Sequence, residues 1–353
     1  MLQGLSKRLP AATTISLAIS LKKFSTGDRD FLLQTSILDR LTAGLCDGVT
    51  GGQDSQEILN MLQEANFFLI PLDHQRIWYR YHYLFAEFLR RRLQETLPDL
   101  IPELHRRASE WYEIAGLTED AIAHAFTAAD YGRAGRLIKR VAPIVVIHND
   151  SPKTFLRWTN KLPDGFLLKD PHLCIYQGWA LVIIDQLEEA EQFLGHAEAH
   201  DDAASQMVFS PHVTALKARI ARAKQDFPRA VALWQQTLRQ LGDGKIEAGF
   251  GEDEIQFIRV LAMNGLAYAF RLSGQLEDAD RTYSRSINLN QGSRNIGFTL
   301  NAIGSRGRIK YSQGQLHQAE RILSQGLYLM QSTLDEDKPG VQHHLLDFEV
   351  QWL

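Results

Sequence analysis

The second half of the chain repeats one short pattern of polar and apolar positions four times. Each copy contains turn residues, a large apolar residue, two mostly polar residues and an alanine. The copies end at four marker alanines, namely Ala190, Ala230, Ala279 and Ala319. A helix pair that recurs in this way cannot bury its apolar face alone, so neighbouring pairs stack into a solenoid. The pattern therefore predicts an α-solenoid, an architecture that binds more often than it catalyses.

Residues at fixed distances from the markers support helix pairs of the tetratricopeptide kind. Twelve positions before each marker the residue is small (Gly178, Ala218, Ala267, Gly307), and four positions after it the residue is large and apolar (Leu194, Trp234, Tyr283, Leu323). A small residue lets two helices cross closely, and the large one packs at the next turn. The markers are 40, 49 and 40 residues apart, more than the about 34 of a tetratricopeptide repeat. We therefore expect longer helices or loops, such as 242–251, and weaker copies at Ala121 and Ala134 place the first pairs earlier.

A different pattern precedes the repeats. Apolar spacing predicts a buried helix over 31–41 and an amphipathic helix over 55–65, which opens on a capping serine. Two aromatic, β-prone runs at 67–72 and 77–81 flank a short polar turn and predict a hairpin. A further helix follows over 81–93. Helices, then a hairpin, then a helix are typical of a winged helix-turn-helix module.

These patterns divide the chain into four expected parts. Residues 1–27 form an N-terminal tail or remnant, 28–98 a winged-helix-like domain, 99–165 a helical linker or the first solenoid helices, and 166–353 the solenoid. The expected fold class is mainly α: a winged-helix module followed by a tetratricopeptide-like α-solenoid that winds as a right-handed superhelix.

Composition limits the classes of function. The net charge is -4 and the sequence pI about 6.3, so no global charge draws the chain to nucleic acid or to an anionic membrane. No run of about 18 apolar residues predicts a membrane span. With only two cysteines, Cys46 and Cys174, a disulfide framework is not expected, and the predicted location is the cytoplasm. Residues 1–27 are either a signal peptide or the end of an upstream domain, and the lack of a clean cleavage site favours the second.

Motifs for catalysis are absent from the sequence. Gly244-Lys245 is followed by Ile246, so the hydroxyl that a phosphate loop needs for magnesium is missing. No cysteine pair, zinc-protease helix or nucleophile elbow occurs. We therefore expect no enzyme and no metal site. His196 and His200, beside Asp201, have metal-binding spacing, but a solvated helix end is the favoured interpretation. The basic runs 90–92 and 106–107 could contact phosphates, although exposed helix faces are favoured.

Longer strings resemble a known family. They look like the large ATP-binding regulators of the LuxR family, the STAND class that includes maltose-regulon activators, and they span 31–41, 45–51, 62–73, 78–89, 104–112 and 121–125. Together with the repeats, the resemblance covers about residues 28–353. In the family, an ATPase core precedes the winged helix, and a superhelical sensor is followed by a LuxR-type DNA-binding domain. An inducer and ATP together drive self-association.

The resemblance also implies what this sequence does not carry. Nothing in 1–27 resembles an ATPase core, and the sequence stops at Leu353 without a DNA-binding domain, so a piece of a longer regulator or a truncated product is expected. ATP or ADP is expected only together with the ATPase core, and direct DNA binding is not expected. In related ATPases a winged-helix histidine touches the β-phosphate of ADP, and His82 is the matching position. The alternative is that His82 only caps or packs at the start of its helix.

The solenoid's first helices supply candidate contacts for a small-molecule inducer or a regulatory protein. They are Gln177, Arg219, Arg222, Tyr268, Arg271, Arg308 and Tyr311. Arginines favour an anionic or polyhydroxyl ligand. The predicted function is thus a transcriptional-regulator fragment that senses an inducer or partner. The alternative is an interaction scaffold without a small-molecule ligand.

Overall fold

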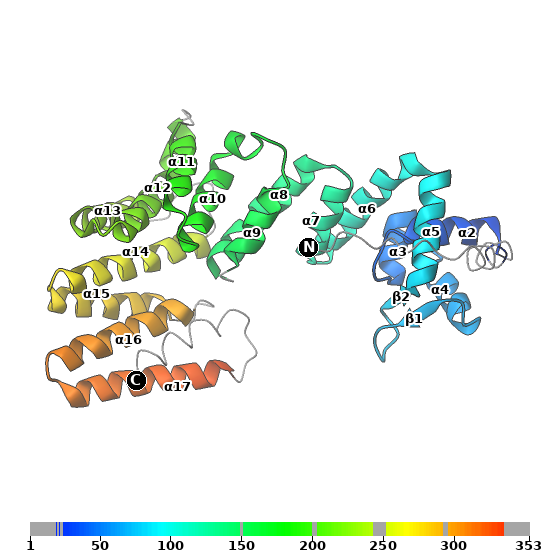
Figure 1. Cartoon of the computed structure of the whole chain (residues 1–353). Coiled ribbons are helices and arrows are strands. Elements are labelled where there is room, and N and C mark those ends of the chain that lie inside the picture. The colour runs from blue at the N-terminus through cyan, green and yellow to red at the C-terminus, as the bar shows by residue number, and fades with distance from the viewer. Residues whose placement is uncertain are drawn as a thin grey trace. The chain divides into compact units, whose positions relative to one another are not determined.

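The structure is a computed structural model that describes Ile19, Leu21 and residues 24–148, 151–199, 203–242, 252–291 and 296–334 (Figure 1). The chain divides into two compact units, Met1–Leu137 and Ile138–Leu353. The described parts are mainly helical, with one two-stranded sheet. The predicted fold class, a winged-helix module followed by an α-solenoid, is confirmed. Within the described ranges no helix is long and apolar enough to cross a membrane.

The first unit holds the winged-helix elements and the first helix pair. Its elements are α2 (Thr26–Thr35), α3 (Ala43–Thr50), α4 (Ser55–Glu64), β1 (Leu69–Pro71), β2 (Tyr79–Tyr81), α5 (Tyr83–Thr96), the 3-10 turn η1 (Pro98–Leu100), α6 (Ile101–Ile114) and α7 (Thr118–Thr127). The helix α8 (Tyr131–Ala142) crosses the boundary between the two units.

The predicted hairpin is present. Strand β1 pairs antiparallel with β2, with Leu69 opposite Tyr81. The carboxylate of Asp73 closes the connecting turn by accepting hydrogen bonds from the backbone N–H groups of Ile77 (3.0 Å) and Trp78 (2.7 Å). These bonds favour the charged carboxylate and lower the pKa of Asp73.

The predicted helix over 31–41 is wrong in its second half. Helix α2 ends at Thr35, and Leu41 instead pairs with Tyr79 as an isolated bridge at the edge of the hairpin. Thr35 Oγ1 bonds the carbonyl of Phe31 and the hydroxyl of Tyr81. Leu38 and Leu41 are buried as predicted, but they lie in a turn and a bridge. Over so short a segment, the spacing of apolar residues in a turn and a bridge resembles the spacing in a helix.

The amphipathic helix α4 is present, but Ser55 is not its cap. Asp54 occupies the N-cap position without a side-chain hydrogen bond to the helix, and Ser55 is the first helical residue and is buried. The Ser55 backbone N–H donates to the carboxylate of Asp47 (3.2 Å). A side chain from α3 therefore satisfies one of the free N–H groups at this helix start.

The winged-helix elements pack on the first helix pair through glycines. The indole of Trp111 on α6 lies against α3, where a Cβ added at Gly48 would be 3.0 Å from the ring and one added at Gly44 3.6 Å from it. Arg40 pairs with Asp120 on α7 (2.7 Å), and its guanidinium lies 4.7 Å from the Trp78 ring centroid. Packing and an ion pair thus hold α6 and α7 to the module.

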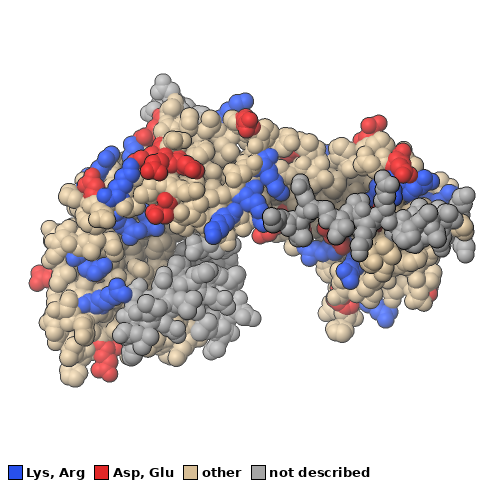
Figure 2. Space-filling view, in the orientation of Figure 1, with Lys and Arg blue, Asp and Glu red and all other residues tan. Residues whose placement is uncertain are grey.

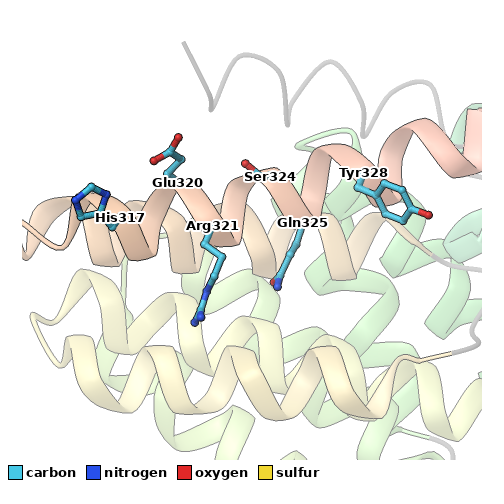
Figure 3. A pocket seen from close by; sticks show the side chains of 6 residues that line it. All are labelled: His317, Glu320, Arg321, Ser324, Gln325 and Tyr328. Atoms are coloured by element: carbon cyan, nitrogen blue, oxygen red, sulfur yellow. The ribbon is translucent and has the colours of Figure 1, made fainter.

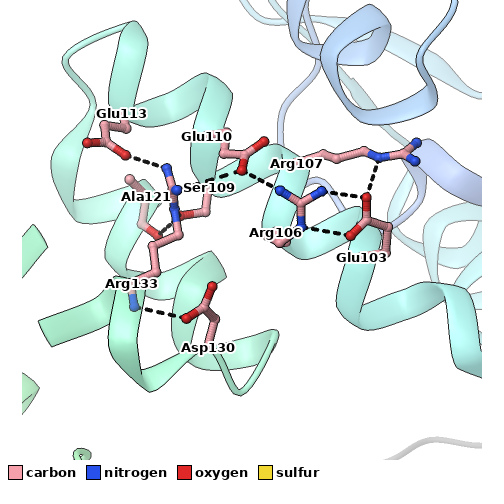
Figure 4. A network of polar contacts seen from close by, with 9 residues as sticks. All are labelled: Glu103, Arg106, Arg107, Ser109, Glu110, Glu113, Ala121, Asp130 and Arg133. Carbon is pink, nitrogen blue, oxygen red and sulfur yellow. Dashed lines mark hydrogen bonds and ion pairs between the residues drawn. The ribbon is translucent and has the colours of Figure 1, made fainter. Parts of the chain in front are cut away.

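A network of charged side chains joins α6 to α8 (Figure 4). At its centre is Arg133, whose side chain is 10% exposed. It donates to the hydroxyl of Ser109 (2.8 Å) and pairs with Glu113, and Ser109 in turn donates to the carbonyl of Ala121 on α7 (2.8 Å). Three helices are therefore linked through one buried guanidinium.

The second unit consists of paired helices. Its elements are the π-helical turn η2 (Pro143–His148), α9 (Pro152–Thr159), the 3-10 turn η3 (Leu167–Lys169), and the pairs α10 (Pro171–Ile183) with α11 (Leu187–Glu198), α12 (Ala203–Ala223) with α13 (Phe227–Leu241), α14 (Glu252–Leu272) with α15 (Leu276–Leu289) and α16 (Ile296–Ser312) with α17 (Leu316–Leu334). Each pair contacts the next, and the first helices α10, α12, α14 and α16 also contact one another in sequence. This stacking is the predicted solenoid.

The repeated turns share one backbone conformation. The residue five positions before each marker has a positive φ, at Gly116, Ala129, Asp185, Gln225, Gly274 and Gly314. In each turn the next N–H bonds the carbonyl five residues earlier, as Asp226 does to Ala221 (2.9 Å) and Gln275 to Phe270 (2.9 Å). This arrangement is a Schellman motif, which satisfies carbonyls at the helix end. The repeated sequence pattern therefore mainly marks the C-terminal end of a helix, which has the same conformation in each copy.

Exchanging the turn residues of two neighbouring pairs tests this interpretation. Gln225 has φ 62° and Gly274 φ 78° at the same position of their pairs, and both are exposed. Since an L side chain is strained there and glycine is not, we expect Gln225→Gly to raise the free energy of unfolding by about 0.5–1 kcal/mol. The matched change Gly274→Gln should lower it by a similar amount. Urea denaturation measures both, and a stabilising Gly274→Gln would contradict the shared geometry.

The markers and the small residues lie at the helix crossings. The marker alanines 190, 230, 279 and 319 are at most 3% exposed. A Cβ added at Gly178 would lie 2.7 Å from Leu216 Cδ2, and one added at Gly307 2.6 Å from Leu323 Cδ2. The predicted small-against-large packing is thus present, although Gly178 receives a leucine of the following pair.

Candidate functional site

His82 lies between β2 and α5, at the N-cap position of that helix. Its side chain makes no capping hydrogen bond, and its backbone N–H donates to Phe68 O (2.7 Å). The imidazole is half-buried between Phe68 (ring centroids 6.4 Å apart) and the exposed Tyr83 (4.8 Å). Nδ1 is buried and has no hydrogen-bond partner within the described ranges. The ring therefore packs at the helix start and keeps a polar atom for another group.

The seven solenoid candidates fall into different environments. Gln177 is 5% exposed, and its side-chain oxygen accepts from Thr159 Oγ1 (2.8 Å), so it belongs to the packing of α9 on α10. Arg219 is half-buried on α12. Arg308 and Tyr311 on α16 are exposed, Tyr311 by 69%. Gln177 is therefore not available on the face that the other residues share.

The structure brings three of the seven together. The guanidinium carbon of Arg222, near the end of α12, lies 4.9 Å from the ring centroid of Tyr268 on α14. That of Arg271, one turn further along α14, lies 5.2 Å from the same centroid. Two cations thus stack on one aromatic ring, a favourable contact for each. We call these residues the Arg222–Tyr268–Arg271 cluster.

The cluster is part of a regular row. Eleven positions before the last three markers lie Arg219, Tyr268 and Arg308, and eight positions before them lie Arg222, Arg271 and Tyr311. Positions eight and eleven are one turn apart on a helix, so they share a face. Three consecutive first helices therefore present arginine and tyrosine on one face.

A second group of polar residues is buried among the first helices, and sequence reasoning missed it. Tyr176 on α10 donates to the carboxyl of Glu254 on α14, and His212 Nε2 on α12 lies 3.7 Å from the same oxygen. The His172 ring packs against Tyr176, with centroids 4.9 Å apart. No motif connects these residues, because three separate helices supply them.

Burial controls protonation in this group. It raises the pKa of the Glu254 carboxyl to about 8, which keeps that group protonated near neutral pH. Burial, and then the neighbouring His172, lowers the pKa of His212 to about 3. Burial, and then Lys139, lowers the pKa of His172 to about 4, and Asp170 opposes this shift. At neutral pH the group therefore carries little charge.

Glu254 should make stability fall as the pH rises from about 6.5 to about 8. Its raised pKa gives a contribution that is complete below its ordinary value of about 4.5 and is lost as the pH passes about 8. The neutral histidines act in the opposite sense, but only below their ordinary pKa of about 6.5. Between about pH 6.5 and 8 we therefore expect losses of up to about 1.4 kcal/mol per pH unit.

The variant Glu254→Gln should remove this slope, since an amide cannot release the proton. Urea denaturation at several pH values between about 6.5 and 8 measures it. The matched control is Glu198→Gln, which changes an exposed carboxylate paired with Lys217. An unchanged slope in Glu254→Gln would contradict the assignment.

Other candidate features give weaker support for a functional site. An open hollow of about 550 Å³ is lined by His317, Glu320, Arg321, Ser324, Gln325 and Tyr328 (Figure 3). All six belong to α17, so the described residues form one wall of it. His196 is exposed, and its predicted companions His200 and Asp201 lie outside the described residues. Over those residues no cluster of three or more His, Cys, Asp or Glu side chains could hold a metal ion.

Several exposed charges pair with nearby residues of opposite sign. Arg90 donates to Ser36 O and Asp39, and Arg106 pairs with Glu103 and Glu110. In the view of Figure 2, both signs lie side by side over α11 to α13, where Lys224 pairs with Glu191 (2.7 Å). The basic runs at 90–92 and 106–107 are thus helix faces with carboxylate partners, as favoured from the sequence. Cys46 and Cys174 are free and buried.

Parts of this chain are similar in sequence to known proteins. Residues 20–101 match the family description "MalT winged helix domain". The HTH-type transcriptional regulator MalT of Klebsiella pneumoniae (strain 342) is 31% identical over 219 residues, which is 60% of this chain and 24% of that protein. Serine/threonine-protein kinase PknK of Mycobacterium tuberculosis (strain CDC 1551 / Oshkosh) is 30% identical over 177 residues, 48% of this chain and 16% of that protein.

A solved structure shows a broader similarity. The signal transduction ATPase with numerous domains and a tetratricopeptide repeat sensor from Pyrococcus horikoshii aligns over 95% of this chain and 61% of that chain, with 13% identity and a TM-score of 0.47. The present chain spans about a quarter or less of the length of the curated relatives described above. The resemblance found in the strings between residues 31 and 93 is confirmed: residues 20–101 match the MalT winged helix domain, and the chain is similar to MalT over 219 residues.

Proposed function

We propose that the chain is the adaptor and sensor part of a transcriptional regulator, and that it acts without catalysis of its own. The observation that carries the proposal is the continuity of a MalT winged helix domain with stacked helix pairs in one chain. Stacked pairs present a long surface to a ligand, and small rotations between pairs change its curvature. An inducer or a regulatory protein bound there would alter the position of the winged helix.

The row of arginine and tyrosine residues on the first helices supports binding at that face. Arginine and tyrosine are enriched at binding hot spots because they combine contact area with directed hydrogen bonds. Arg308 and Tyr311 are exposed there. The alternative function, a scaffold that holds another protein without a small-molecule ligand, would use the same face.

A thermal-shift panel separates the two functions. The purified chain is heated with individual metabolites, including neutral sugars, nucleotides and small organic acids. A ligand that binds only the folded chain raises Tm with its concentration, and such a rise supports the sensor. If no metabolite raises Tm and a defined protein is captured instead, sensing of a small molecule is refuted and the scaffold is favoured.

His82 is proposed to contact a phosphate of a nucleotide held by an ATPase core elsewhere in the regulator. Its support is the buried Nδ1 without a partner among the described residues, next to the exposed ring of Tyr83. An imidazole can donate from that atom to a phosphate oxygen. In a complete regulator, His82→Ala should weaken ADP binding about tenfold, and unchanged binding would refute this role.

The same proposal places the chain in the cytoplasm of its cell. The two buried, free thiols suit a reducing compartment. Coupling to a LuxR-type DNA-binding domain and self-association on activation belong to the proposal as well. A gel-shift assay with promoter DNA tests the adaptor role, because tight, sequence-selective binding by this chain alone would contradict it.

A further inference from the structure

Two guanidinium groups lie against one ring in the Arg222–Tyr268–Arg271 cluster, and among the described residues no carboxylate forms an ion pair with either of them. The Nε atoms of both arginines are buried and have no hydrogen-bond partner in the described part of the chain. On α16, by contrast, Arg306 (2.8 Å) and Lys310 (3.1 Å) both pair with the carboxylate of Asp280. A cluster of buried, unpaired donors is costly unless an acceptor binds.

The surroundings of the cluster add a third donor. Tyr283 on α15 is fully buried, and its hydroxyl lacks a hydrogen bond of normal geometry among the described residues. Burial raises its pKa, while Ser305 and Arg271 lie close enough to oppose this shift. The Tyr283 hydroxyl therefore stays protonated at neutral pH and can donate.

Burial raises the energetic cost of leaving the charged guanidinium group of Arg222 without a partner. Burial lowers the pKa of the Arg222 guanidinium, and only the two tyrosines Tyr268 and Tyr283 oppose the shift. A half-buried guanidinium keeps its charge, so its interaction with an anion is screened less than at a fully exposed site. Arginine also offers a planar fork of donors that matches the two oxygens of a carboxylate or phosphate.

We propose that the Arg222–Tyr268–Arg271 cluster binds the carboxylate or phosphate group of a small anionic metabolite. The guanidinium groups supply the donors to the oxyanion, and their contacts with the Tyr268 ring fix their positions. Because Arg222 comes from α12 and the other two residues from α14, the ligand joins two consecutive helix pairs. It would thereby set the angle between the pairs, which is the quantity that a solenoid sensor can transmit.

This inference rests on the proposed sensor function and names its ligand class. The two can fail separately. A neutral sugar that raises Tm, with no anion binding at the cluster, would keep the sensor and remove this site. Anion binding at the cluster without any effect on a complete regulator would keep the site and remove the sensor.

Isothermal titration calorimetry of the purified chain tests the site. The probes are inorganic phosphate and succinate, each titrated at fixed ionic strength against chloride. We expect saturable binding of at least one of them, and the stronger probe identifies the group as phosphate or carboxylate. No saturation by either up to about 20 mM, well above the about 1 mM dissociation constant of a weak specific site, would overturn the proposal.

Variants locate the binding. Arg222→Gln and Arg271→Gln should each weaken the bound probe at least tenfold, and the double variant should abolish saturation. Arg308→Gln is the matched control, since it removes an exposed arginine from the same face outside the cluster, and should change affinity less than twofold. Tyr268→Phe keeps the ring and should also bind. Equal affinity in the double variant and the unchanged chain would show that the anion binds elsewhere and would refute the site.

Discussion

Replacing Gly265 by alanine is expected to lower the free energy of unfolding by about 2–3 kcal/mol. A Cβ at this position of α14 would lie 2.4 Å from Cε2 and 2.6 Å from Nε1 of Trp234 on α13. Trp234 is 1% exposed and among the largest fully buried side chains. A rigid indole in a filled site cannot move away as the end of a flexible side chain can, so the helices must separate. Urea denaturation measures the loss.

The control for this prediction is a helical glycine with free space. A Cβ at Gly195 on α11 meets nothing within 4 Å, so Gly195→Ala should raise stability by up to about 1 kcal/mol through helix propensity alone. A second variant tests the cause. If the indole is the obstacle, Gly265→Ala should be less harmful in a Trp234→Leu background than in the unchanged chain. Additive effects would contradict the direct contact.

Replacing Arg133 by methionine is expected to lower the free energy of unfolding by about 3 kcal/mol. The change keeps the length and apolar stem of the side chain but removes the cation. It leaves Ser109, which is fully buried, without its donor, and the carboxylates of Glu113 and Glu110 without their shared partner. The loss should appear in the first unit, where α6, α7 and α8 meet.

Arg106→Met on the same network provides the comparison. Its side chain is 41% exposed, and exposed ion pairs contribute at most about 1 kcal/mol. Both variants are measured by urea denaturation at the same pH. Similar losses for Arg133→Met and Arg106→Met would show that burial does not set the strength of this network.

The repeat was readable from the sequence because its signals are local. A helix stop, a large residue and a marker alanine lie within six consecutive positions, and the Schellman bonds at the helix stop also span six residues. The weak copy before Ala134 shows the limit of this approach. The sequence pattern suggests that the turn begins at Asp130, but the residue with positive φ is Ala129, an amino acid that does not signal such a conformation.

Contacts between helices distant in the sequence could not be predicted in the same way. Gly265 and Trp234 belong to the packing of one pair on the next, and Gly265 is not one of the small residues twelve positions before a marker. The partners of Glu254 are 42 and 78 residues away in sequence. Arg222, Tyr268 and Arg271 could be proposed as sharing a face from their repeat positions. Their meeting on one ring, and the exclusion of Gln177 from that face, depend on how the pairs stack.

The contact of Trp111 with Gly44 and Gly48 has a practical consequence for dissecting the chain. A fragment that stops at residue 98, where the sequence pattern changes, would lose α6. The face of α3 that carries Gly44 and Gly48 would then be exposed to solvent. A fragment that starts at residue 99 would leave the indole of Trp111 uncovered. Exposed apolar surface of this kind favours aggregation. Pieces meant to fold independently should therefore keep residues 24–137 together, so that the contacts of Arg133 with Ser109 and Glu113 are also retained.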